Sequence, residues 1–257
     1  MFSRSEDSTF SRSILNRGAI YQEADQLLPT GKRMRFYYLP GASSLFPHIV
    51  LVEAGLSFAA VKVDEQTKAM DGGGDYRNVN PLGYVPALQL EDGTVLTEAA
   101  AIAQYVSDRV PAKKLAPPNG TIDRAKLQSW LNFISSEMQL GCFCPLFDRE
   151  IPLDVKASFR RRLDSRLAYV EHHLAGNAYL LGNDFSIADV YLFVVSNWAP
   201  AVNLDLRPYP GILDLRKRIG ARPAVQEAMK RENLISRRLA NPRMTGPGRA
   251  WGELPTP

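Results

Sequence analysis

The segment Asn80–Ile102, NPLGYVPALQLEDGTVLTEAAAI, constrains the fold more than any other part of the chain. Pro86 precedes the apolar run ALQL, and because proline cannot donate to a strand ladder, it is expected at the start of a strand, with Val85-Pro86 as a candidate cis bond. The tight EDGT turn then joins ALQL to a second short strand, as in a β-hairpin. The segment therefore predicts two antiparallel strands that lead directly into a helix over Glu98–Asp108.

The preceding segment predicts a strand (Phe36–Leu39), a helix (Ser44–Ala54) and a second strand (Phe58–Val63). The first strand is short and aromatic, and the helix has apolar residues at helical spacing. Two strands that flank a helix are expected to be parallel, because the connection is a crossover. The resulting order, βαβ-ββα, resembles that of a thioredoxin-like α/β domain, which we expect to cover residues 34–111.

After a linker at 112–122, residues 123–235 predict only helices. Apolar residues keep one face through two long helices. A third helix starts at FSIADVY, where Ser186 and Asp189 have the spacing of a capping box. An all-α domain is therefore expected to follow the α/β domain.

The net charge of +4 arises at the two ends of the chain. Residues 1–33 carry five basic and four acidic side chains, and residues 236–257 carry four basic and one acidic, so the part between them is neutral. A basic face for nucleic acid is not expected on the folded part. No window has the length of an apolar membrane span. From their composition, we expect a disordered N-terminal extension and a flexible C-terminal tail.

Cys142 and Cys144 are the only cysteines, and a spacing of two residues suits neither a structural disulfide nor a complete metal site. Free thiols are typical of a reducing compartment, so a cytoplasmic protein without a bound metal is expected. Both thiols are expected to be buried and unremarkable.

Ser43 and Ser44 lie where the first strand gives way to the helix. One serine can cap the helix while the other is solvated, or a hydroxyl can face a ligand, since a helix N-terminus gathers unpaired N–H groups and partial positive charge. A cis bond at Pro86 would leave the Val85 N–H and C=O free to pair with a peptide. At the start of the next helix, N–H groups could hold a carboxylate while Glu98 holds an ammonium. These features predict a site for a peptide with an amino-acid head group.

Four stretches together are similar to the bacterial beta class of glutathione transferases: FYYLPGASSLFPHIVLVEAGLSF, DYRNVNPLGYVPALQLEDGTVLTEAAAIAQYV, WLNFISSEM and YLLGNDFSIADVYLFVV. The resemblance runs from Met34 to about Leu234 in the family's order and spacing. It implies a thioredoxin-like domain followed by a helical glutathione-transferase domain, with glutathione as co-substrate. It also implies conjugation of the glutathione thiolate to small apolar electrophiles, a role in detoxification, and a homodimer.

The resemblance also assigns residues to the glutathione site. It implies that Val85 and Pro86 bind the cysteinyl backbone. Glu98 and the Ala99 N–H would bind the γ-glutamyl group, and Lys68 would bind the glycyl carboxylate.

Two further matches of the resemblance lie in the helical domain. Asn132 and Glu137 correspond to positions near the subunit interface and the glutathione site.

Two departures from the family pattern bear on the chemistry. The family usually has a cysteine at the position of Ser43 and a histidine at that of Gln139, and the resemblance implies that Gln139 is one of the residues of the glutathione site. An alcohol cannot form a disulfide, so thiol–disulfide exchange through Ser43 is excluded, whereas a transferase step needs only the thiolate of glutathione. We expect Ser43 to face that thiol and Ser44 to cap the helix. Tyr37 and Tyr38 are rival donors, of which at least one must lie in the core.

His48 is expected to pack behind the site rather than act as a base. Two other functions stay open on the sequence alone. One is a glutathione-fold protein that binds apolar ligands or partners with little turnover, because both family side chains nearest the sulfur have changed. The other is glutathione-dependent peroxide reduction, which needs the same thiolate.

Overall fold

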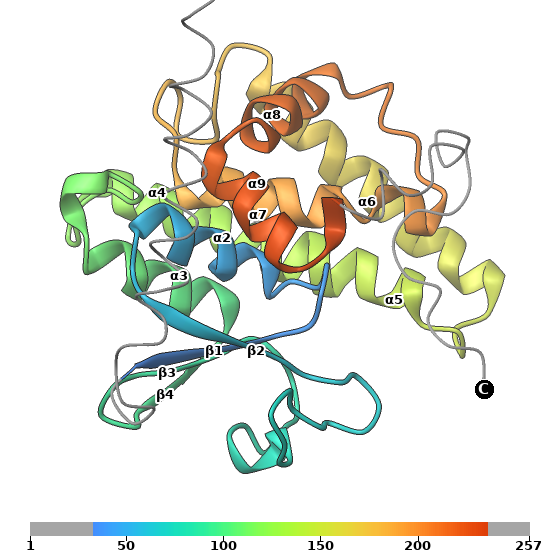
Figure 1. Cartoon of the computed structure of the whole chain (residues 1–257). Coiled ribbons are helices and arrows are strands. Elements are labelled where there is room, and N and C mark those ends of the chain that lie inside the picture. Colours follow the sequence, from blue (N-terminus) through green and yellow to red (C-terminus); the bar gives the residue numbers. More distant parts are fainter. Residues whose placement is uncertain (1–32, 236–257) are drawn as a thin grey trace, which may run out of the picture.

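The computed structural model describes residues 33–235, which begin with a four-stranded mixed sheet in the order β2-β1-β3-β4 (Figure 1). β1 is parallel to β2 and antiparallel to β3, and β3 is antiparallel to β4, as the predicted crossover and hairpin require. The peptide bond Val85-Pro86, just before β3, is cis. The strands are β1 (Met34–Tyr38), β2 (Phe58–Lys62), β3 (Ala87–Gln89) and β4 (Val95–Thr97).

Two helices of this part, α2 (Leu45–Ala54) and α3 (Ala99–Asp108), lie between the sheet and the remaining helices (Figure 1). α2 contacts α3 on one side and α7 and α9 on the other. One large hydrophobic core runs continuously from the inner face of the sheet through α2 into the helical part. A small second cluster that includes Tyr37 and Tyr76 covers the opposite face of the sheet.

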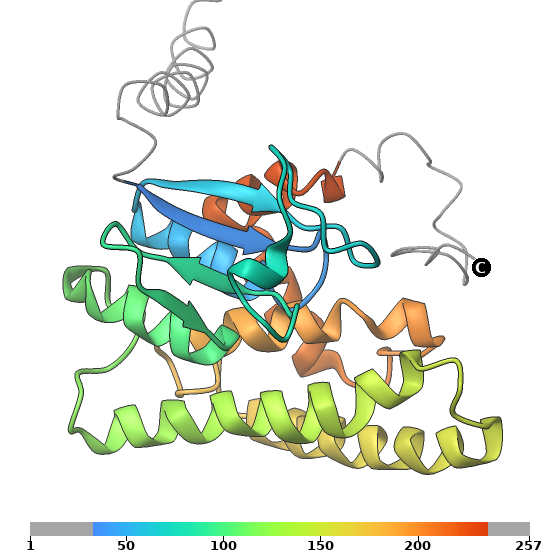
Figure 2. The same cartoon turned by 90° about the horizontal axis from the view of Figure 1, so that it is seen from below.

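The second part of the chain is helical, and Figure 2 shows its two longest helical stretches running alongside each other on the side of the molecule away from the sheet. Short 3₁₀ turns occur at Tyr76–Asn78, Pro111–Lys113 and Ala199–Val202. The longer elements are α4 (Ile122–Asn132), a π-helix (Phe133–Phe143), α5 (Cys144–Phe147), α6 (Leu153–Leu174), α7 (Ile187–Ser196), α8 (Pro210–Gly220) and α9 (Pro223–Arg231).

α7 forms the centre of the helical part, and each of its residues is buried. The predicted capping box is present, since Ser186 accepts from the backbone at the start of α7 and Asp189 accepts from the Ser186 N–H at 2.8 Å. Asp189 also accepts from the Leu180 N–H at 2.8 Å, so one carboxylate fixes both the helix and the loop before it. Burial raises the pKa of this carboxyl to about 6, although its hydrogen bonds act in the opposite direction.

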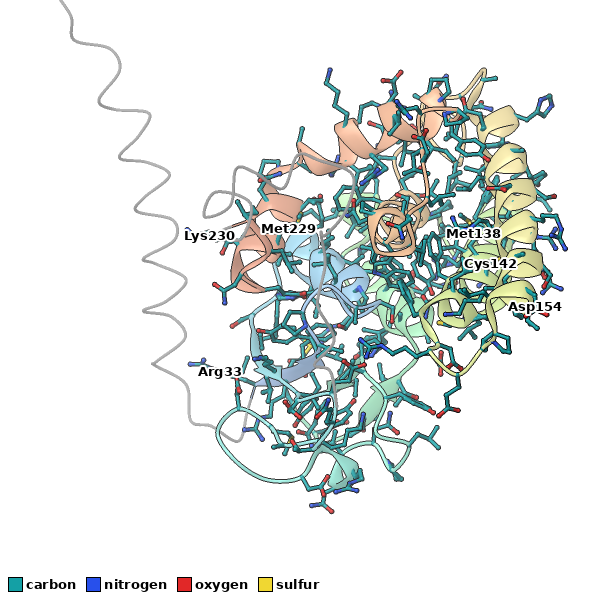
Figure 3. All side chains as sticks on the ribbon, turned by 90° about the vertical axis from the view of Figure 1, so that its right-hand side faces the viewer. Arg33, Met138, Cys142, Asp154, Met229 and Lys230 are labelled. Atoms are coloured by element: carbon teal, nitrogen blue, oxygen red, sulfur yellow. The ribbon has the colours of Figure 1, made fainter. Side chains whose placement is uncertain are left out.

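The first long helix differs from the expected regular α-helix, because it continues from α4 into a π-helix. A Cβ atom at Gly141 would lie 2.7 Å from the Ser136 carbonyl oxygen, so only glycine fits this wide turn. Figure 3 shows Met138 and Cys142 of the π-helix pointing into the interior, whereas Asp154 on α6 points away from it. The π-helix therefore changes which side chains face α7.

These elements confirm the expected fold class, a thioredoxin-like α/β domain followed by an all-α domain. The domain boundaries at residues 111 and 122 stay predictions. The expected extension, except for its last residue, and the expected tail lie outside the described residues. Within residues 33–235, no helix has the length and apolar character needed to cross a membrane.

Candidate active site

The register of the sheet brings the predicted site residues to one edge. Tyr37 pairs with Ala87 and Ala87 pairs with Thr97, so the end of β1, the start of β3 and the end of β4 lie side by side. β2 ends at the same edge because it runs parallel to β1. The loops at this edge carry the predicted residues Ser43, Ser44, Lys68, Val85, Pro86, Glu98 and Ala99.

Ser44 does not cap α2 as expected. It occupies the N-cap position, but its side chain makes no capping hydrogen bond. The fully buried hydroxyl instead accepts from the Leu39 N–H at 3.1 Å and donates to the Leu39 carbonyl at 3.0 Å. Because its single proton is used in the loop, Ser44 is a weaker candidate than Ser43 for the contact with the thiolate.

Ser43 is only partly buried at the start of α2. Its carbonyl accepts from the Phe46 N–H at 3.1 Å, which begins the first turn of the helix. Among the described residues, none hydrogen-bonds the Ser43 hydroxyl. This hydroxyl is therefore available to a ligand at the positive end of α2.

Two residues of the helical part hold the loop that carries Ser43. The Gly41 N–H donates to Glu232 Oε2 at 2.9 Å, and Trp198 Nε1 donates to the Gly41 carbonyl at 2.9 Å. The other Glu232 oxygen lies 2.7 Å from His48 Nδ1, and both of these side chains are fully buried. His48 packs behind the site, as expected. Glu232 and Trp198 were missed, because nothing in the local sequence links them to Gly41.

Tyr37 and Tyr38 are both buried, one on each face of the sheet. The Tyr37 hydroxyl donates to Gln89 Oε1 at 3.2 Å, so it is paired within the fold. Burial raises the pKa of Tyr38, and the negative charges of Glu232 and Asp71 raise it further. Tyr38 thus keeps its proton at neutral pH, and it stays a rival donor by prediction only.

The loop before β3 presents unpaired backbone groups. Among the described residues, none hydrogen-bonds the Val85 N–H or C=O. The preceding turn is fixed because the Tyr84 carbonyl accepts from Asn80 Nδ2 at 2.7 Å and from the Tyr76 hydroxyl at 2.9 Å. A rigid loop with a free edge of this kind can pair with an extended peptide.

The start of α3 has an unusual backbone at Glu98, with φ of 67° and an exposed side chain. A non-glycine residue with positive φ costs of order 1–3 kcal/mol, and such residues cluster at ligand sites. No side chain caps α3, so the N–H groups of its first turn, before that of Ile102, have no capping partner. This end of α3 therefore offers donors for a carboxylate next to an exposed carboxylate that can bind an ammonium.

Lys68 also has positive φ, 61°, and lies in the loop after β2. Its half-buried side chain crosses Gly83, where an added Cβ would lie 3.3 Å from Lys68 Cε. Gly83 is two residues from Val85, so the Lys68 ammonium and the free backbone edge are close enough to serve one ligand.

Gln139 lies on the π-helix and contacts α7. The Tyr191 hydroxyl donates to Gln139 Oε1 at 2.8 Å, and the Tyr191 ring stacks on Phe46 of α2 with centroids 4.4 Å apart. Burial raises the pKa of Tyr191 to about 12, and the charge of Glu98 adds to this effect. Gln139 therefore lies on the helical side of the boundary with α2.

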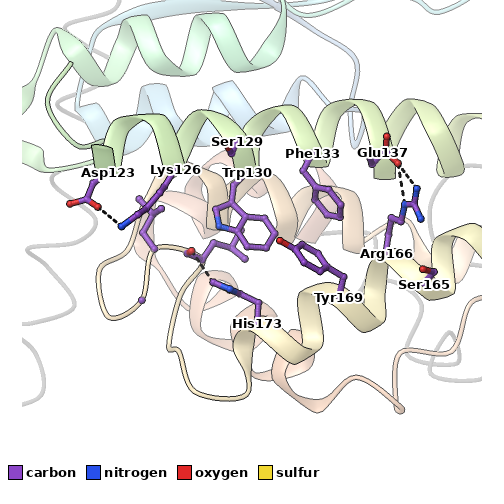
Figure 4. A pocket seen from close by; sticks show the side chains of 13 residues that line it. Asp123, Lys126, Ser129, Trp130, Phe133, Glu137, Ser165, Arg166, Tyr169 and His173 are labelled. Carbon is purple, nitrogen blue, oxygen red and sulfur yellow. Dashed lines mark hydrogen bonds and ion pairs between the residues drawn. The ribbon is translucent and has the colours of Figure 1, made fainter. Parts of the chain in front are cut away.

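Asn132 and Glu137 lie elsewhere. Asn132 is exposed at the end of α4, and Glu137 forms an ion pair with Arg166 of α6, with 2.6 Å between oxygen and nitrogen. Glu137 lines a groove of about 920 Å³ between the first long helical stretch and α6, with Trp130 and Tyr169 at its centre (Figure 4). None of the predicted sheet-edge residues lines this groove.

The two cysteines differ from each other, contrary to the expectation that both are buried. Cys142 is fully buried and its Sγ donates to the Glu137 carbonyl at 3.1 Å. Cys144 is exposed at the start of α5. Burial raises the pKa of the Cys142 thiol. The pKa of Cys144 is also raised, because the protein removes part of the water around its sulfur although the residue as a whole is exposed.

Family comparisons agree with this geometry. The chain matches the glutathione S-transferase N-terminal domain over residues 44–109 and the glutathione S-transferase C-terminal domain over residues 133–223. It is 44% identical over 201 residues to glutathione S-transferase GstA of Escherichia coli O157:H7, an alignment that covers 78% of this chain and 100% of GstA. It is 34% identical to glutathione S-transferase GST-4.5 of Xanthomonas campestris, over 78% of this chain and 100% of that protein.

Solved structures give the same result. The chain is 51% identical to BphK, a bacterial glutathione transferase whose structure was solved as a ternary complex. The two structures superpose with a TM-score of 0.76, and the match covers 78% of this chain and 100% of BphK. A sphingomonad glutathione S-transferase complexed with glutathione is 42% identical with a TM-score of 0.75, over 78% of this chain and 99% of that chain. The chain therefore belongs to the glutathione S-transferase family.

Proposed function

We propose that this glutathione transferase conjugates the thiolate of glutathione to small apolar electrophiles. The observation that carries the proposal is that three groups lie at one edge of the sheet. They are the unpaired backbone of Val85, the uncapped start of α3 with Glu98, and the hydroxyl of Ser43. These groups match the three parts of glutathione: its peptide backbone, its amino-acid head and its thiol.

The peptide would bind through main chain and charge. Its cysteinyl N–H and C=O would pair with the Val85 backbone beside Pro86. The γ-glutamyl ammonium would meet Glu98 and its carboxylate the Ala99 N–H, while Lys68 would pair with the glycyl carboxylate. Peptide binding would then hold the thiol at the start of α2.

Ser43 would make the bound thiol acidic enough to react. A thiol with an ordinary pKa of about 8.5 is only a few per cent ionised at pH 7, and a decrease of two units corresponds to about 2.7 kcal/mol. A hydroxyl bond to charged sulfur supplies roughly 1.5 to 3 kcal/mol, and the helix end about 0.3 to 1 kcal/mol. Together the hydroxyl bond and the helix end are sufficient to lower the thiol pKa by about two units. Tyr38 and Ser44 are the alternative donors.

Attack by the thiolate forms the C–S bond, and the displaced electron pair leaves with a halide or moves onto the electrophile. The electrophile would lie against the helical part, with Gln139 on that side. Fixed placement of the two reactants would supply much of the rate enhancement.

A homodimer is also proposed, with the groove between α4, the π-helix and α6 in its interface (Figure 4). Tyr169 in this groove and Leu140 and Ile122 on its helices are 56%, 59% and 71% exposed. Such exposed apolar side chains are typical of a protein–protein contact. A cytoplasmic location is proposed from the two free cysteines. Size-exclusion chromatography with light scattering tests the dimer, and Tyr169→Glu should yield monomers.

Titration of bound glutathione by the ultraviolet absorbance of its thiolate tests the main proposal. A lowered thiol pKa together with turnover of electrophiles supports a transferase. Binding with an ordinary pKa and no turnover would favour a ligand-binding protein. Consumption of hydroperoxides without conjugation would favour a peroxidase.

A further inference from the structure

The carbonyl of Tyr84, in the turn before β3, is held by two buried side chains. The Tyr76 hydroxyl donates to it at 2.9 Å, and Asn80 Nδ2 donates to it at 2.7 Å. Both Tyr76 and Asn80 are buried. A carbonyl oxygen has two lone pairs, so two donors satisfy it. The Tyr84 carbonyl is therefore fully paired and directed toward the interior.

The same peptide unit carries the Val85 N–H. The Tyr84–Val85 bond is trans, and in a planar trans peptide the C=O and the N–H point in opposite directions. Because the carbonyl is held on the inner side, the Val85 N–H points outward, where no residue within 33–235 accepts from it. The two buried donors thus decide the direction of a main-chain group that is proposed to bind glutathione.

The side chains of the turn do not hold this peptide unit by packing. Leu82 and Tyr84 are both exposed. Asn80 supplies a further bond instead, since its Oδ1 accepts from the Leu82 N–H at 3.2 Å. The direction of the Val85 N–H therefore depends on hydrogen bonds from the two buried donors.

Tyr76 also connects this turn to the loop that carries Lys68. Its N–H donates to the Lys68 carbonyl at 2.9 Å, and its ring packs against Tyr37 of β1, with centroids 5.4 Å apart. Burial raises the pKa of Tyr76 to about 12, so its hydroxyl keeps its proton at neutral pH and stays a donor. One buried residue therefore joins the sheet, the Lys68 loop and the Tyr84 carbonyl.

We propose that Tyr76 and Asn80 are positioning residues for glutathione, because their bonds to the Tyr84 carbonyl direct the Val85 N–H at the cysteinyl carbonyl of the bound peptide. Both act through one main-chain peptide unit rather than through a contact with the ligand. The inference rests on the proposed pairing of Val85 with glutathione. Loss of either donor should weaken one particular contact, the bond to the cysteinyl carbonyl.

Two variants remove one donor each. Tyr76→Phe removes the hydroxyl and keeps the ring, and Asn80→Asp removes the Nδ2 donor and keeps an oxygen for the Leu82 N–H. We expect each to raise the Kd for glutathione about 3- to 10-fold, the effect of losing one ordinary hydrogen bond. KM for glutathione should rise as well, whereas kcat at saturating glutathione should stay within about twofold of the wild-type value.

Tyr209→Phe is the matched control. It removes a phenol that donates to a main-chain carbonyl, that of Asp164, at 3.5 Å in the helical part of the chain. This bond has no connection to the turn before β3. The control should therefore leave both Kd and KM for glutathione unchanged.

Two shorter ligands identify the bond that is lost. γ-Glutamylcysteine lacks the glycine but keeps the cysteinyl carbonyl, whereas γ-glutamylcysteamine also lacks this carbonyl and keeps the γ-glutamyl group, the N–H and the thiol. Isothermal titration calorimetry gives the Kd of each ligand. Tyr76→Phe should weaken binding of γ-glutamylcysteine about 3- to 10-fold and leave the Kd for γ-glutamylcysteamine unchanged. Because both ligands are compared on the same variant, a general loss of stability cancels.

An equal loss of affinity for the two short ligands in Tyr76→Phe would show a general structural role and overturn the inference. An unchanged Kd for glutathione in both variants would overturn it too. Absence of glutathione binding or of turnover in the wild-type protein would instead refute the proposed function, so the two failures are distinguishable.

Discussion

Replacement of Glu232 by alanine should destabilise both the fold and the loop that carries Ser43. The Glu232 carboxylate accepts from the Gly41 N–H at 2.9 Å and lies 2.7 Å from His48 Nδ1. The side chains of Glu232 and His48 are both fully buried. His48 Nε2 already lacks a partner among the described residues, so the substitution would leave both ring nitrogens unpaired.

The magnitude follows from the groups left behind. A buried polar group without its partner costs about 1–3 kcal/mol, and removal of one member of a buried ionisable pair costs about 3–5 kcal/mol. We expect Glu232→Ala to lower the free energy of unfolding by about 3–5 kcal/mol. Since 1 kcal/mol shifts Tm by about 2–4 °C in a chain of this size, Tm should fall by roughly 6 to 20 °C.

Glu227→Ala is the matched control, because it removes a glutamate one turn earlier, on α9. Glu227 pairs with Arg231 at 2.9 Å at the surface, and such exposed i,i+4 pairs contribute only about 0.3–0.5 kcal/mol. Differential scanning calorimetry of the two variants measures the contrast. Glu232→Gln, which keeps an oxygen for the Gly41 N–H, should lie between them.

The functional consequence is separate from the stability. Because Gly41 lies two residues before Ser43, Glu232→Ala should also lower kcat at a temperature where the variant is folded. If Glu232→Ala melts within about 2 °C of Glu227→Ala, the reasoning from buried pairing is refuted. If it melts lower but keeps full kcat, the loop does not depend on Glu232 for its position.

Three further predictions concern the ligand, the thiol and pH. Glu98→Ala should lose retention on immobilised glutathione, while the surface variant Glu91→Ala keeps it; equal retention of both would remove Glu98 from the site. Ser43→Ala should raise the pKa of bound glutathione by about one to two units, through loss of one bond to charged sulfur of roughly 1.5 to 3 kcal/mol, with little change in affinity. An unchanged thiolate absorbance titration would transfer this role to Tyr38. Asp189→Asn tests the buried capping box. Burial raises the pKa of Asp189 in the folded protein to about 6 from 3.8. Wild-type stability should therefore fall as Asp189 loses its proton between about pH 4 and pH 6. The Tm advantage of wild type over Asp189→Asn should therefore shrink between about pH 4 and pH 6 and level off above it; an advantage that grows with pH would contradict the raised pKa.

Features set by neighbours in the chain could be predicted from the sequence. The cis bond at Val85-Pro86, the hairpin after it and the capping box at Ser186 each depend on a few adjacent residues, and all three are present. The sheet register follows from these short strands, and with it the gathering of Ser43 and Glu98 at one edge.

The tertiary structure alone decided how that edge is supported. The Gly41 loop is held by Trp198 and Glu232, which lie 157 and 191 residues further along the chain, and no local pattern predicts contacts at such separations. Ser44 was expected to cap a helix because serine is common there, yet its hydroxyl pairs with Leu39. Propensity describes what a residue can do with its neighbours in the chain, whereas packing decides which of those bonds is made.

The direction of Gln139 is the clearest case of this difference. The sequence predicts a helix around it, but the wide turn at Gly141 changes the helical phase, and the partner Tyr191 lies on another helix 52 residues away. The identity of the residue is a property of the sequence. Which atom of its amide is paired is decided by the tertiary structure, because the buried Tyr191 hydroxyl donates to Oε1.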